Sequence, residues 1–136
     1  MPFDENLVLH DGTTITADIS PTSLTRTNGS AVIDLGKTKV SGLYASLFTG
    51  EAMAEADDKM QVTIEESAAV ASGWQEIARF PEVSAAQRER SLSFITSQRY
   101  IRAKIDITDD DGGGDFSLAN VNILLGTSPE NDVSQV

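Results

Sequence analysis

The strongest structural signal in this chain is the stretch KMQVTIE, residues 59–65, in which apolar and polar side chains alternate. Such alternation is typical of a β-strand with one face in a core and the other toward solvent. The stretch YIRAKIDI, residues 100–107, repeats the pattern and places Arg102, Lys104 and Asp106 on the solvent side. The apolar members of both stretches are the predicted core: Met60, Val62, Ile64, Ile101, Ala103, Ile105 and Ile107.

Shorter runs of the same kind predict further strands, and no run favours a helix long enough to form a layer. These strands fall at residues 31–35, 42–49, 74–80, 91–95 and 116–125. Seven or eight strands without crossover helices predict an all-β protein, a single β-sandwich of the jelly-roll or Greek-key kind. The Asp/Gly-rich loop Asp109 to Asp115 predicts a hairpin that makes the strands on either side of it neighbours.

The length of 136 residues fits one domain, and 40% hydrophobic against 23% charged residues is a globular composition. We expect residues 1–30 to form an N-terminal arm or edge strand, residues 31–125 the sandwich, and residues 126–136 a polar tail. No apolar stretch is long enough to span a membrane, and the acidic start differs from a signal peptide. The chain has no cysteine, so disulfides, thiolate metal sites and cysteine nucleophiles are excluded.

The net charge of −11 weighs against nucleic acid as a partner, because phosphate binding requires a basic surface. The charge is uneven, however. Residues 79–104 hold six basic and two acidic residues, a net +4, which leaves −15 for the other residues. Two interpretations stay open: solvated strand faces, or a docking surface for an acidic protein partner. We call the six basic residues the basic band: Arg79, Arg88, Arg90, Arg99, Arg102 and Lys104.

Catalytic and metal signals are weak. The phosphate-loop, nucleophile-elbow and zinc-protease motifs are absent, and the single histidine, His10, is predicted to lie on the surface beside Asp11 and Gly12. Four aspartates between Asp109 and Asp115 offer oxygen ligands for Ca²⁺, but their spacing is not that of an EF-hand. We therefore expect no enzyme activity, no metal site and no cofactor.

Trp74, the only tryptophan, has two interpretations. Together with Tyr44 and Tyr100 it could form a platform for sugar binding. The favoured interpretation places it in the core, because it begins a strand that also contains Ile77 and Phe80.

Several short motifs, taken in order, resemble one family. They are the strand Val32 to Gly36, the run Thr63 to Ser67 ahead of Trp74, and Tyr100-Ile101-Arg102 before a glycine-rich loop. This succession is similar to the Bbp16-type capsid cement (decoration) proteins of tailed bacteriophages, over roughly residues 4 to 125. The resemblance implies a jelly roll without catalytic residues that binds the outside of an icosahedral shell.

Its implied partners are the major capsid protein of the HK97 fold and further copies of itself, as a dimer or trimer. The implied location is the outer capsid surface of the virion. From charge and hydropathy we expect neither nucleic acid nor a membrane as a partner. The main rival function is a carbohydrate-binding β-sandwich of a tail fibre or secreted glycosidase, and a glycosidase itself comes third.

Overall fold

The computed structural model describes residues 7–39, 41–50, 58–83, 89–109 and 116–127. Within these residues the chain forms eight strands and no helix. No described helix is therefore long and apolar enough to cross a membrane. The strands are β1 (Val8–Asp11), β2 (Ile33–Asp34), β3 (Leu43–Thr49), β4 (Lys59–Ser67), β5 (Gln75–Arg79), β6 (Glu89–Phe94), β7 (Tyr100–Thr108) and β8 (Val121–Thr127).

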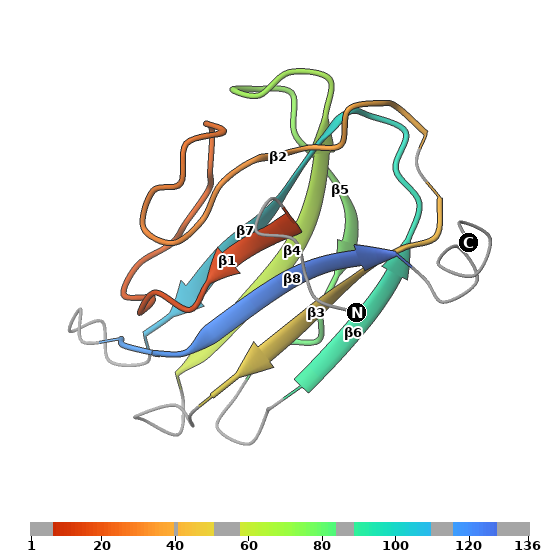
Figure 1. The fold of residues 1–136 in the computed structure, drawn as a ribbon. Coiled ribbons are helices and arrows are strands. Elements are labelled where there is room, and N and C mark those ends of the chain that lie inside the picture. Colours follow the sequence, from red (N-terminus) through yellow and green to blue (C-terminus); the bar gives the residue numbers. More distant parts are fainter. Residues whose placement is uncertain (1–6, 40, 51–57, 84–88, 110–115, 128–136) are drawn as a thin grey trace.

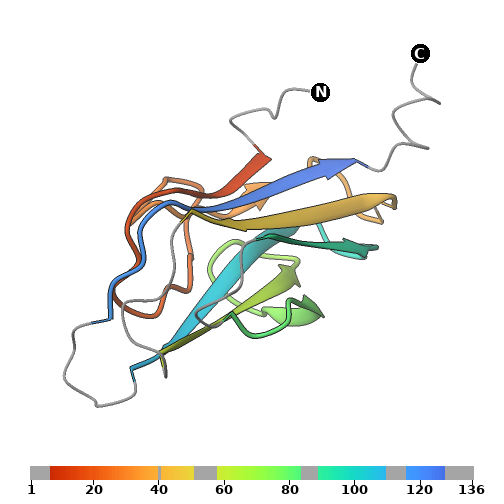
Figure 2. The same ribbon diagram turned by 90° about the horizontal axis from the view of Figure 1, so that it is seen from below.

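The strands form two antiparallel sheets packed face to face, as Figures 1 and 2 show. The first sheet has the order β1-β8-β3-β6, and the second sheet has the order β2-β7-β4-β5. In this order consecutive strands cross repeatedly from one sheet to the other, which is the connectivity of a jelly roll. The prediction of an all-β jelly-roll sandwich is confirmed.

The core lies between the sheets and is built from the strand faces that the alternation predicted. Six of the seven predicted core residues are completely buried, and only Ile107, near the end of β7, is partly exposed. The first sheet contributes Leu47, Ile123 and Leu125 from β3 and β8. Because every second residue of these strands is removed from water, burial of apolar side chains fixes which face of each sheet points inward.

The predicted hairpin at Asp109 to Asp115 is wrong. β7 lies between β2 and β4, whereas β8 lies between β1 and β3 in the other sheet, so this connection joins the two sheets. Residues 110–115 themselves lie outside the described residues. The strand expected at 116–125 is also shorter, because Asn120 has a positive φ of 58° and β8 begins only after it.

The N-terminal segment folds back on β1 and buries the histidine, so the prediction of a surface His10 is wrong. Asn28 and Gly29, both with positive φ, form a two-residue turn of the kind that closes hairpins. The turn brings Ser30 to His10, which is fully buried. His10 donates from Nε2 to the carbonyl oxygen of Thr13 at 2.8 Å and accepts from the Ser30 hydroxyl at Nδ1, at 2.7 Å.

Candidate partner-binding surface

The basic band does not form one continuous surface. Arg79 is on β5 and Lys104 on β7, both in the second sheet, and Arg99 immediately precedes β7. Arg90 lies on β6 at the edge of the first sheet, and Arg88 lies outside the described residues. Closeness in sequence therefore did not bring these residues onto one face, because the jelly-roll order assigns successive strands to different sheets.

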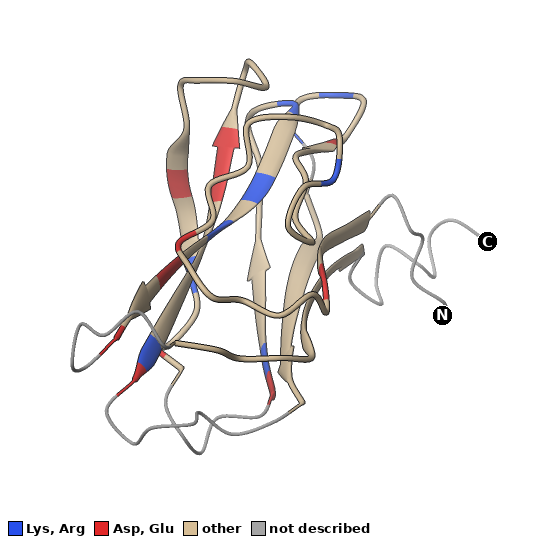
Figure 3. Cartoon of the chain, turned by 90° about the vertical axis from the view of Figure 1, so that its left-hand side faces the viewer, with Lys and Arg blue, Asp and Glu red and all other residues tan. Residues whose placement is uncertain are grey.

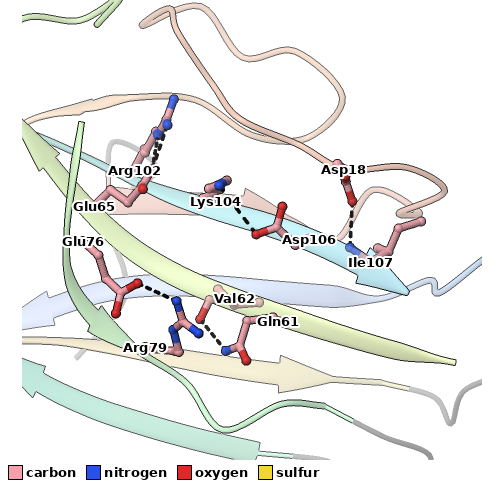
Figure 4. Close-up of polar contacts among 10 residues, drawn as sticks. All are labelled: Asp18, Gln61, Val62, Glu65, Glu76, Arg79, Arg102, Lys104, Asp106 and Ile107. Atoms are coloured by element: carbon pink, nitrogen blue, oxygen red, sulfur yellow. Dashed lines mark hydrogen bonds and ion pairs between the residues drawn. The ribbon is translucent and has the colours of Figure 1, made fainter. Parts of the chain in front are cut away.

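Arg102 is buried, so the prediction that it faces solvent is wrong. Its side chain points outward from β7, yet it is only 8% exposed. The guanidinium lies 2.7 Å from a carboxylate oxygen of Glu65 on the paired strand β4, and it donates to the carbonyl oxygen of Pro21 at 2.8 Å. It also stacks on the ring of Trp74, 4.4 Å from the centroid. Figure 4 shows the Arg102–Glu65 contact on the outer side of the sheet.

Each of the other described band residues on or next to the second sheet is paired with a carboxylate; Arg79 and Arg99 are exposed, and Lys104 is half-buried. Arg79 contacts Glu76 at 2.7 Å and Lys104 contacts Asp106 at 3.8 Å, both visible in Figure 4. Figure 3 shows basic and acidic segments interleaved along the chain rather than separated into fields. This face therefore presents a mosaic of both charges, and a partner would have to match that mosaic rather than supply negative charge alone.

Arg99 forms the most specific of the exposed pairs. It donates to both carboxylate oxygens of Asp34 at 2.7 and 2.8 Å. These hydrogen bonds hold the pKa of Asp34 below its ordinary value and raise the pKa of Arg99. The guanidinium also lies 5.4 Å from the centre of the Tyr100 ring. Such two-pronged pairs favour arginine over lysine, because only the planar guanidinium presents two parallel N–H groups.

Two lysines that the charge window omitted follow β2, the strand that carries Asp34, the partner of Arg99. Lys37 and Lys39 are exposed in the turn that follows β2, and the backbone N–H of Leu35 in that connection donates to the carbonyl oxygen of Arg99. The sequence already shows that Lys37 and Lys39 follow the strand predicted at 31–35 and the glycine after it. Only the pairing of β2 with β7 brings them to the same end of the sandwich as Arg99.

The aromatic residues do not form a shared platform. Trp74 is outside the core, contrary to the favoured interpretation, and lies half-buried against Arg102 on the outer side of the second sheet. Tyr100 has Arg99 over its ring, while Tyr44 is on β3 in the first sheet and packs against Gly126. An arginine thus covers each of the two rings on the second sheet.

Among the described residues no three histidine, aspartate or glutamate side chains are grouped so that they could hold a metal ion. Residues 110–115, which make up most of the acidic loop considered for Ca²⁺, lie outside those residues. Comparison of the chain with protein-family models and with curated proteins found no match.

Proposed function

We propose that this protein is a structural virion protein that binds the outside of an icosahedral phage capsid and cements neighbouring capsomers. The partner in this proposal is the major capsid protein of the HK97 fold, contacted by many copies of the protein. No chemistry is assigned to any residue, and the role is purely one of surface binding.

The observation that carries the proposal is the agreement between the sequence resemblance and the strand order. The motifs similar to cement proteins imply a jelly roll, and the two sheets have the orders β1-β8-β3-β6 and β2-β7-β4-β5. The outer face of the second sheet adds support, since its ordered ion pairs give a fixed pattern of charge. Each such pair at an interface rim is weak, so attachment would depend on many copies acting together.

The rival carbohydrate-binding function has less support. Sugar-binding sites of β-sandwiches use exposed aromatic faces, whereas Arg102 stacks on Trp74 and Arg99 on Tyr100. The indole N–H of Trp74 is buried, so it cannot reach a sugar hydroxyl in this conformation. Fluorescence titration with oligosaccharides tests this function, because Trp74 is the only tryptophan and a bound sugar would shift its emission.

The cement proposal is tested by co-sedimentation of the protein with undecorated capsids. The informative variant combines Arg79→Gln, Arg99→Gln and Lys104→Gln, which neutralise three solvent-accessible cations on or next to the second sheet and leave buried Arg102 unchanged. We expect wild type to decorate the shells, less at high salt because the charges are screened within a Debye length of roughly 10 Å at 0.1 M. The triple variant should bind less than wild type at low salt, and the difference should shrink as salt rises.

The matched control changes net charge by the same amount elsewhere, through Thr14→Glu, Thr16→Glu and Ser117→Glu at exposed positions. If the control and the triple variant lose equal binding, total charge rather than the second sheet controls attachment. If wild type decorates no shells at any salt concentration, the cement function is wrong.

A further inference from the structure

Three of the four sheet edges are protected against pairing with another chain. β1 has a bulge between Val8 and His10, and Arg26 donates to the carbonyl oxygen of Val8. β2 is only two residues long. Ile19 of the N-terminal segment pairs with Ile105, in a part of β7 that β2 does not reach. β5 has a bulge against β4 and carries the Glu76–Arg79 ion pair. Bulges, short length, charges and covering loops are the devices that prevent edge-to-edge association.

Within the part of the chain that the structure describes, the fourth edge, β6, has no bulge and no covering segment, and its charges are confined to one end. It pairs with β3 alone, over six consecutive residues without a register shift. It contains no proline, glycine or lysine, and its charged residues, Glu89 and Arg90, are both at one end. Its middle is Ser91-Leu92-Ser93, in which both serines are exposed and small enough for another strand to approach.

An apolar surface adjoins this unprotected edge. Ile95, directly after β6, is 70% exposed, the largest value among the described large apolar side chains. Beside it a groove of about 430 Å³ opens between β6 and β5, lined by Gly42, Leu43, Ile77, Ser93, Phe94 and Ile95. A regular edge and an apolar patch are independent signs of an interaction site, and here they coincide.

We propose that β6 pairs with β6 of a second copy, antiparallel about a two-fold axis, so that two first sheets join into one sheet of eight strands. Self-association through this edge does not depend on capsid binding. An antiparallel arrangement places the charged end of each strand beside the uncharged end of the other, whereas a parallel one would oppose Glu89 to Glu89 and Arg90 to Arg90. Although the chain carries −11, Glu89 and Arg90 balance each other on this strand, so two copies that meet at this locally neutral edge bring no net charge together there.

Backbone geometry restricts the register. Successive residues of a strand direct their N–H and C=O groups to opposite sides, so even-numbered residues of one copy must oppose even-numbered residues of the other. With the axis at Arg90, the two copies of its guanidinium group would lie opposite each other. With the axis at Ser91 or Leu92, no like charges lie opposite each other, and five residues of each strand are paired.

The test is sedimentation of the purified protein without capsids, between about 1 µM and 1 mM. We expect a reversible monomer–dimer equilibrium that Ser91→Lys and Ser91→Glu each weaken at least tenfold, because both registers place these charges opposite or diagonal to each other. Ser117→Lys, at an exposed position away from β6, is the matched control and should dimerise like wild type. Ser91→Lys reduces the size of the negative net charge, so an effect of total charge would strengthen association. Weakening by this variant therefore identifies the β6 edge as the interface.

Cysteine cross-linking gives a second measurement, because the natural chain has no cysteine. A disulfide needs Cα atoms within about 7 Å, so Ser91→Cys or Leu92→Cys should form one according to which residue lies on the axis. A monomer at all concentrations, a trimer, or a dimer unaffected by both Ser91 variants would each overturn the inference. Failure of capsid binding alone would leave it standing.

Discussion

The buried contact between Arg102 and Glu65 leads us to expect a large loss of stability from a substitution at Arg102, which the sequence pattern alone would not predict. Replacing Arg102 with alanine removes the ion pair, the hydrogen bond to Pro21 and the cover over Trp74. Glu65, whose side chain is only 12% exposed, would then keep a charge without its partner. Breaking one side of a buried pair costs about 3 to 5 kcal/mol, so the free energy of unfolding should fall by about that amount.

Arg99→Ala is the matched control. Arg99 also contacts a carboxylate with two hydrogen bonds and lies over an aromatic ring, but its side chain is 49% exposed. Solvent screens that pair, so its removal should cost much less stability. Urea unfolding followed by the fluorescence of Trp74 measures both variants. The reasoning is refuted if Arg102→Ala is no more destabilising than Arg99→Ala.

Three further outcomes follow from the structure and the sequence. Ile105→Ala should lose about 2 to 5 kcal/mol in the same assay, because the side chain is fully buried, and a loss under about 0.5 kcal/mol would contradict that placement. Burial lowers the pKa of His10, so the unfolded chain binds a proton at this residue more readily than the folded chain does. The free energy of unfolding should therefore fall as the pH drops below about 6.5, by at most about 1.4 kcal/mol per pH unit. His10→Gln should abolish this dependence between pH 7 and 5. Calorimetric titration with Ca²⁺ should show no saturable micromolar binding; such binding, if abolished by Asp110→Asn, would establish the acidic loop as a site.

The sequence was sufficient for the sandwich because alternation reports directly on which side of a strand faces the core. Met60 and Ile105 were placed correctly for this reason, and both are completely buried. Alternation carries no information on which strands pair. The hairpin between β7 and β8 was mispredicted because loop composition does not show that a chain crosses to the other sheet.

The errors at individual residues share one cause. Arg102 and Trp74 were assigned from their own strands, but the two stack on each other outside the core, and Pro21, from a segment distant in sequence, accepts a hydrogen bond from Arg102. His10 was likewise judged by its neighbours in sequence, while Ser30 and the turn at Asn28 bury it. What covers a face depends on contacts between distant segments, which a local pattern does not contain.

In the function proposed above, the protein attaches to the outside of capsids and bridges capsomers. Electron microscopy of the same shells, with and without added protein, tests it most directly. We predict additional density on the outer surface that spans the boundaries between capsomers and fits the eight-stranded sandwich. Shells that remain bare at saturating protein and low salt would contradict the claim.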